Sequence, residues 1–136
     1  MNKEFVVLVV EDDMMTRNVI VELLRDEGFQ AEEADGVRST LEKFAPGKFK
    51  VVVLDKKLGD GLGVDLCHQV IKADPTVRIF LFAGATDEVR LAALAAGAAE
   101  VLQKPYDLTK LSFLVKREFR RSTNELEDLT RGAVVN

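Results

Sequence analysis

Acidic residues and a lysine stand directly after apolar runs that lie far apart in the sequence. They are Glu11, Asp12 and Asp13 after one run, Asp55 after a second, and Lys104 after a third. Carboxylates placed together repel one another unless a cation lies among them, and Mg²⁺ is the expected cation because it prefers oxygen ligands. A metal ion and a lysine beside an aspartate nucleophile would suit phosphoryl transfer. An unrelated α/β protein whose exposed acids cap helices remains the alternative on the residues alone.

The acids and the lysine can meet only if the apolar runs form strands of one sheet. Strands are expected at residues 5–10, 29–34, 51–54, 77–82 and 100–103. Helical spacing between them predicts helices bounded by Asp13 and Gly28, Gly36 and Pro46, Val64 and Asp74, Asp87 and Gly97, and a last helix after Asp107. This alternation predicts a doubly wound α/β fold, a five-stranded parallel sheet with five helices on its two faces. The carboxyl ends of parallel strands share one edge, where ligands bind.

Apolar spacing also predicts which helix positions face the core. The expected inward positions are Val19, Ile20, Leu23 and Leu24 in the first helix, Val37, Leu41 and Phe44 in the second, and Cys67 in the third. Cys67 is the only cysteine, so it is expected to be a small core residue in a reducing compartment. His68, the only histidine, falls on the polar side of its helix and is expected at the surface.

Length and charge limit the function classes. The chain has 136 residues, and we expect one domain at residues 1–121 and a polar tail or helix extension at residues 122–136. A net charge of −4 argues against nucleic-acid binding as the main task. The first apolar run is too short to cross a bilayer and lacks a cleavage site behind it, so we expect no membrane association and a cytoplasmic protein.

Four sequence motifs, in order and at matching spacing, resemble the receiver domains of bacterial two-component response regulators. They are Val-Val-Glu-Asp-Asp at 9–13, Val-Val-Leu-Asp at 52–55, Leu-Gly-Asp-Gly-Leu-Gly at 58–63, and Ala-Gly-Ala at 96–98 followed by Leu-Gln-Lys-Pro-Tyr at 102–106. The resemblance covers residues 5 to about 121. It implies a flavodoxin-like strand order of 2-1-3-4-5 and a signalling phosphoacceptor rather than an enzyme with a separate substrate.

The resemblance also implies a role for each site residue. Asp55 would be the nucleophile that accepts a phosphoryl group from a histidine kinase or a histidine phosphotransfer protein. Asp12 would bind Mg²⁺ directly and Glu11 through water, while the backbone carbonyl of Lys57 would be a further ligand. Lys104 would contact the phosphoryl oxygens. Asp13, one place past the acid pair, is expected to cap a helix instead.

The sequence departs from the family pattern at three places. Ala83 stands where the family usually has a serine or threonine that binds the phosphoryl group, and Thr86 is a candidate substitute. Val101 stands where the family has a switching aromatic residue. Lys56 and Lys57 follow the nucleophile directly, either as a solvated charged loop or with the Lys57 side chain reaching into the acid pocket. Capture of a phosphoryl group can survive these changes, but the usual conformational readout lacks both of its parts.

Three functions therefore remain open at the sequence level. The first is a phosphoacceptor in two-component signalling, and the second is a degenerate receiver that acts as a constitutive protein-interaction module. The third is a small Mg²⁺-dependent phosphatase or hydrolase, which lacks a dedicated acid–base residue. A downstream protein target and a homodimer are further expectations. Apolar spacing at 115, 119, 122, 126 and 129 indicates either a weak coiled-coil seam or a fraying tail.

Overall fold

The computed structural model describes residues 5–84, 87–104 and 107–135. These residues form one five-stranded parallel sheet with helices packed against it. The sheet strands are β1 (Val6–Val10), β2 (Gln30–Ala34), β3 (Val51–Asp55), β6 (Arg78–Ala83) and β7 (Glu100–Gln103). Their spatial order is β2-β1-β3-β6-β7, and every neighbouring pair is parallel. The short strands β4 and β5 form a separate two-stranded hairpin, so β6 and β7 are the fourth and fifth strands of the main sheet. The predicted strand order 2-1-3-4-5 is therefore confirmed.

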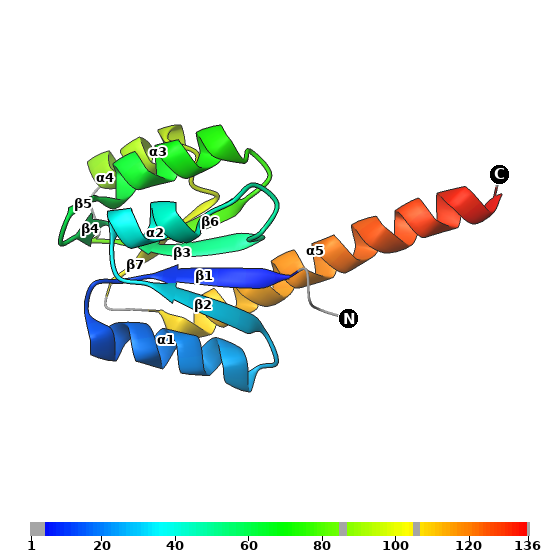
Figure 1. Cartoon of the computed structure of the whole chain (residues 1–136), viewed down its shortest axis with the longest axis horizontal. Coiled ribbons are helices and arrows are strands. Elements are labelled where there is room, and N and C mark those ends of the chain that lie inside the picture. The colour runs from blue at the N-terminus through cyan, green and yellow to red at the C-terminus, as the bar shows by residue number, and fades with distance from the viewer. Residues whose placement is uncertain (1–4, 85–86, 105–106, 136) are drawn as a thin grey trace.

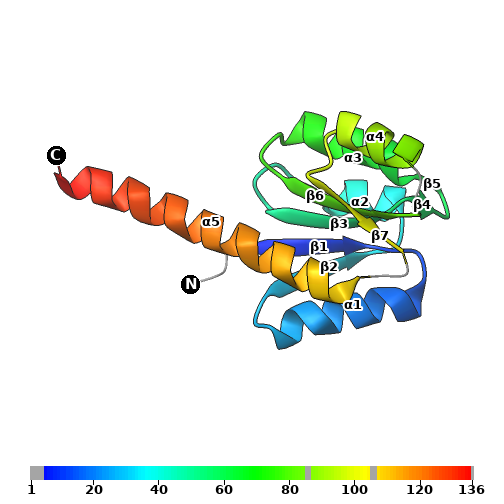
Figure 2. The same cartoon turned by 180° about the vertical axis from the view of Figure 1, so that it is seen from behind.

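Helices cover both faces of the sheet, as a doubly wound fold requires. Helices α1 (Met14–Asp26) and α5 (Leu108–Val135) lie on one face, as Figures 1 and 2 show. Helices α2 (Val37–Lys43), α3 (Gly63–Ala73) and α4 (Asp87–Ala95) lie on the other. The five predicted helices are therefore present.

Strand β1 contributes to two separate cores because its side chains alternate between the two faces of the sheet. Val6, Leu8 and Val10 pack in the cluster that includes residues of α3 and α4. Val7 and Val9 pack in the cluster that includes residues of α1 and α5. Burial of such a side chain stabilises the fold by roughly 1.5–3 kcal/mol. An apolar run with no polar alternation is what a strand buried on both faces needs.

Two predicted core positions in the helices are wrong. Val19 is 52% exposed, while Val21 is buried beside Ile20 in α1. Leu41 is 44% exposed, while Thr40 is fully buried in α2. Thr40 tolerates burial because its hydroxyl donates a hydrogen bond of 2.8 Å to the carbonyl of Gly36, so its polar group stays satisfied.

Helix ends follow the residue types that were expected to set them. Asp13 caps α1, since its carboxylate accepts the N–H of Thr16 at 2.9 Å. Gly28 follows α1 with φ of 92°, a left-handed conformation that favours glycine. Asp107 accepts the N–H of Lys110 at 3.0 Å at the start of α5.

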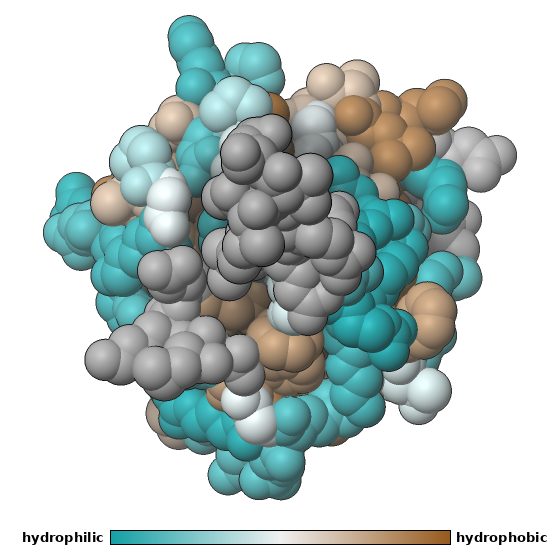
Figure 3. Space-filling model, turned by 90° about the vertical axis from the view of Figure 1, so that its right-hand side faces the viewer, coloured by the Kyte–Doolittle hydropathy of each residue, from teal (hydrophilic) through white to brown (hydrophobic). Residues whose placement is uncertain are grey.

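Helix α5 continues well beyond the body of the domain (Figures 1 and 2). Val115 is buried, and Phe119 packs against Phe5 and Phe29 with ring centroids 5.3 and 5.8 Å apart. The first two positions of the expected seam therefore belong to the core of this domain. The backbone then stays helical to Val135. Figure 3 looks at the end from which this helix projects, and hydrophilic side chains cover much of that face.

Candidate functional site

The strand ladders extend one residue past the carboxyl ends of the strands and so fix the predicted site residues. Each of three residues there donates its backbone N–H to a neighbouring strand. The bonds are Glu11 to Ala34 (3.1 Å), Lys56 to Phe82 (2.9 Å) and Lys104 to Ala83 (3.0 Å). Asp55 itself is paired with Phe82 in the ladder. Rigid backbone on both sides therefore holds Asp55, Glu11 and Lys104 at the same edge of the sheet.

Three of the predicted carboxylates form one cluster at this edge. Glu11, Asp12 and Asp55 each offer an oxygen, and these oxygens all lie within 4.8 Å of one another. Glu11 is 3% exposed and Asp55 is 6% exposed, whereas Asp12 opens to solvent. Lys104 places its Nζ 2.6 Å from Oδ1 of Asp55. The structure thus brings together four of the five predicted site residues through their side chains.

The residues of this cluster fit a magnesium ion. Two buried carboxylates and a third beside them are a costly arrangement, because desolvation and mutual repulsion both act against it. Lys104 contacts Asp55, and a divalent cation would balance the remaining charge. The three ligands are hard oxygens, and the exposure of Asp12 leaves room for the water ligands that Mg²⁺ retains. The acidic cluster is of the kind expected for a receiver Mg²⁺ site.

Asp13 does not share in this cluster. Its Oδ2 accepts two hydrogen bonds from Thr16, at 2.6 Å from the hydroxyl and 2.9 Å from the backbone N–H. These bonds hold the pKa of the Asp13 carboxyl below its usual value, the hydroxyl bond most strongly. Asp13 therefore acts as the helix cap that its position predicted.

The loop after Asp55 folds into a short hairpin that was not predicted. Its strands are β4 (Lys57–Leu58) and β5 (Gly61–Leu62), paired antiparallel. The Lys57 side chain is exposed. The structure therefore favours a solvated Lys57 side chain over one that replaces the metal. The carbonyl of Lys57, two residues past Asp55, remains a predicted metal ligand.

Gly63 closes the base of the hairpin against the nucleophile. Its N–H donates a hydrogen bond of 2.7 Å to the carbonyl of Lys56. A Cβ at this position would lie 2.0 Å from the backbone oxygen of Asp55, which no side chain allows. The sequence indicated a tight turn for these glycines, and the close backbone contact is the physical reason that Gly63 is needed.

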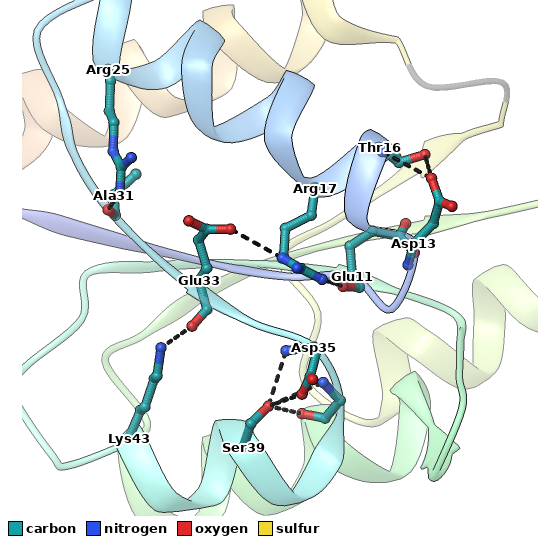
Figure 4. A network of polar contacts seen from close by, with 11 residues as sticks. Glu11, Asp13, Thr16, Arg17, Arg25, Ala31, Glu33, Asp35, Ser39 and Lys43 are labelled. Atoms are coloured by element: carbon teal, nitrogen blue, oxygen red, sulfur yellow. Dashed lines mark hydrogen bonds and ion pairs between the residues drawn. The ribbon is translucent and has the colours of Figure 1, made fainter.

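Arg17 links the acidic turn to strand β2 through its hydrogen bonds, a role that the sequence did not reveal (Figure 4). Its guanidinium donates to the carbonyl of Glu11 at 2.7 Å and to the carboxylate of Glu33 at 3.0 Å. Lys43 donates to the carbonyl of Glu33, which links α2 to the same network. The signal was weak, because an arginine in the first turns of a helix usually faces solvent.

The two positions of the missing relay are buried and apolar. Ala83 is fully buried, and Val101 is 7% exposed. They lie on adjacent strands, where Leu81 is paired with Val101 and Ala83 with Gln103. Neither side chain offers a hydroxyl or an aromatic ring. Thr86, the candidate substitute for the hydroxyl, lies outside the described residues.

The remaining reactive side chains lie away from this chemistry. Cys67 is buried, and burial raises the pKa of its thiol to about 11, so the thiolate is scarce at neutral pH. His68 is exposed on α3, as expected. Within the part of the chain that the structure describes, every helix is too short or too polar to traverse a bilayer.

Comparison with known proteins agrees with this geometry. The model of the response regulator receiver domain family matches residues 7–116. The sensory transduction protein LytR of Staphylococcus haemolyticus is 30% identical over 127 residues, which are 90% of this chain and 49% of that protein. The chain thus spans about half the length of that relative. It spans only 24% of the putative NtrX-like response regulator of Rickettsia bellii.

Solved structures give the same result. A CheY-like receiver domain protein from Methanospirillum hungatei superposes with a TM-score of 0.81 at 26% identity, covering 89% of this chain and 98% of that one. The BeF3-activated receiver domain of DrrB superposes with a TM-score of 0.77 at 27% identity, covering 85% and 97%. Because the family model matches most of the chain and an acidic pocket lies at the expected strand ends, this chain belongs to the response regulator receiver domain family.

Proposed function

We propose that this chain is a phosphoacceptor of two-component signal transduction in the cytoplasm, with Asp55 as the acceptor. The observation that carries the proposal is the contact of Asp55 with Lys104 at 2.6 Å inside a carboxylate cluster no wider than 4.8 Å. The donor would be a phosphohistidine on a histidine kinase or a histidine phosphotransfer protein. The modified domain would then change a contact with a downstream protein.

The transfer step uses residues that the fold already holds in place. An oxygen of the Asp55 carboxylate attacks phosphorus, the phosphorus–nitrogen bond of the donor breaks, and the departing imidazole takes up a proton. Lys104 neutralises an oxygen of the phosphoryl group, because its ammonium already lies against the acceptor. Mg²⁺, held by Glu11, Asp12, Asp55 and the Lys57 carbonyl, would supply the charge that offsets the phosphoryl oxygens.

The test is the intact mass of the protein after incubation with acetyl phosphate. We expect a gain of one phosphoryl group that requires Mg²⁺ and is lost in Asp55→Asn. Asp13→Asn is the matched control, because asparagine also caps helices and Asp13 lies outside the pocket. Asp13→Asn should gain the same mass as the wild type. Modification that persists in Asp55→Asn would mean that another residue is the acceptor.

A second candidate function rests on Ala83 and Val101. Their buried apolar side chains favour a degenerate receiver that binds its partner in one constitutive state. Such a domain would bind Mg²⁺ and yet gain no mass from the phosphodonor. A Mg²⁺ titration run beside the mass measurement separates the two functions, and metal binding without modification would select the constitutive module.

A further inference from the structure

The hairpin of β4 and β5 lies between the acid pocket and helix α2. At its base, Gly63 is hydrogen-bonded to Lys56 and packs closely against the backbone of Asp55. In its middle, the Leu58 side chain is buried in the core cluster on the α3 face of the sheet. Near its tip, a Cβ on Gly59 would lie 3.7 Å from Oδ2 of Asp12, so the hairpin backbone passes close to that carboxylate.

Asp60, at the tip of the hairpin, caps helix α2 from 23 residues away in sequence. Its Oδ1 accepts the N–H of Val37 at 2.7 Å, and its Oδ2 accepts the N–H of Arg38 at 3.0 Å. The residue at the cap position of α2 is Gly36, which has no side chain to accept these bonds. One carboxylate from the hairpin therefore satisfies two amide groups that the helix leaves without a partner.

Two glycines make this contact sterically possible. A Cβ on Gly36 would lie 2.5 Å from Oδ1 of Asp60, and a Cβ on Gly61 would lie 2.8 Å from Cγ2 of Val37. The hairpin and the start of α2 are thus packed with no space for a methyl group on either side. The two hydrogen bonds lower the pKa of the Asp60 carboxyl, the bond from Arg38 most strongly, so Asp60 is ionised at neutral pH.

We propose that Asp60 is a positioning residue for the metal site: its bonds to Val37 and Arg38 hold the hairpin so that the Lys57 carbonyl faces the carboxylates of the pocket. This inference rests on the proposed function, because it concerns the metal ion of the same site. Lys57 lies between Lys56, which is bonded to Gly63 at the base of the hairpin, and Asp60 at its tip. Loss of the tip anchor would free the backbone of Lys57 while every side-chain ligand stays intact.

The experiment is a titration of the full chain with Mg²⁺, followed by amide NMR. We expect Asp60→Ala to bind Mg²⁺ roughly tenfold more weakly, the scale on which the loss of a residue that orients a metal ligand is felt. In the wild type, Mg²⁺ should shift the amide signals of Val37 and Arg38, and this shift should vanish in Asp60→Ala. A role in helix stability alone would not connect those two amides to the metal.

Three further variants separate position from charge and from stability. Gly36→Ala keeps every carboxylate but pushes Asp60 aside, so it should weaken Mg²⁺ binding as Asp60→Ala does, and it serves if Asp60→Ala fails to fold. Asp65→Asn removes an exposed charge from the first turn of α3 and should leave affinity unchanged. Asp74→Ala removes a carboxylate that accepts the N–H of Gly47 at 2.8 Å elsewhere in the fold, so it should cost stability but not affinity.

The outcomes decide between this inference and the proposed function. Affinity within twofold of the wild type in both Asp60→Ala and Gly36→Ala would overturn the inference, as would an equal loss in Asp74→Ala. A wild type that binds no Mg²⁺ would overturn it as well. A wild type that binds Mg²⁺ but accepts no phosphoryl group would refute the phosphoacceptor proposal and leave the role of Asp60 standing.

Discussion

The acid pocket and the opposite end of the domain both contain buried carboxylates, but the charges around these carboxylates differ. In the pocket, Glu11, Asp12 and Asp55 crowd together, and Lys104 forms an ion pair with Asp55. At the other end, Glu118 is a buried carboxylate surrounded by guanidinium groups. Its Oε2 lies 3.1 Å from Nη1 of Arg121, 3.2 Å from Nη2 of Arg117 and 3.5 Å from Nε of Arg78.

The contrast separates a structural cluster from a functional one. Around Glu118 the guanidinium groups outnumber the carboxylate, so this buried acid is fully paired, and the contacts join the start of β6 to α5. In the pocket, the negative charges exceed the positive charge of Lys104. An arrangement that is unfavourable for the metal-free domain suits a site that binds a cation, whereas an acid paired with guanidinium groups suits a purely structural role.

The largest effect on stability should come from the end of the domain that holds Glu118. Glu118→Ala leaves three guanidiniums without their shared partner and should lower the free energy of unfolding by about 2 kcal/mol, since the arginines are partly exposed and water screens them. Urea denaturation measures this loss. Mg²⁺ affinity should remain that of the wild type, and a parallel loss of affinity would mean that the two ends are coupled.

The acidic turn offers a paired test inside the pocket. Asp12→Ala removes a ligand charge and should weaken Mg²⁺ binding about tenfold, equivalent to roughly 1.4 kcal/mol. Asp13→Ala should change affinity little, because Asp13 is committed to Thr16. Calorimetric titration of both variants checks the contrast. Equal losses would show that Asp13 also faces the metal.

A smaller effect should appear in the metal-free protein, with the opposite sign. Asp12→Asn relieves repulsion with Glu11 and Asp55, so it should raise the free energy of unfolding by up to about 1 kcal/mol without Mg²⁺. Saturating Mg²⁺ should cancel or reverse this gain, since the wild type then binds the ion more tightly. Thermal unfolding with EDTA and with Mg²⁺ measures both. A variant less stable than the wild type in EDTA would argue against net repulsion in the pocket.

The sequence predicted the parts of the molecule that depend on local pattern. Runs such as Val6–Val10 indicate buried strands, and the residues directly after them reach the site because parallel strands end at one edge. Asp13 as a cap and Cys67 as a core residue followed from spacing alone. The error at Val19 arose because a two-sided apolar stretch on a helix leaves the centre of its buried face undecided.

The parts that the sequence did not predict depend on contacts between distant segments. Asp60 caps a helix that begins 23 residues before it, and Arg17 binds the carboxylate of Glu33 on the edge strand. No local pattern encodes either bond, because each requires that the tertiary fold is already in place. The hairpin itself was hidden by its length, since strands of two residues leave no periodicity to detect.

The smallest effect concerns the two departures at Ala83 and Val101. A beryllofluoride mimic of the phosphoryl group, added with Mg²⁺, should shift the amide signals of residues 57–62, which lie beside Asp55, more than those of residues 88–101. The reason is that the buried methyl group of Ala83 offers no hydroxyl to follow the mimic, and Val101 offers no aromatic ring to reorient.

Ala83→Thr is the matched variant for this last expectation. Threonine suits a strand and restores the hydroxyl, so the mimic should then shift the signals of residues 88–101 more than it does in the wild type. Because Ala83 is fully buried, the stability of the variant must be measured beside the spectra to separate a repacked core from a restored relay. Large shifts over residues 88–101 in the wild type would refute the expectation, because they would require a relay that needs neither side chain.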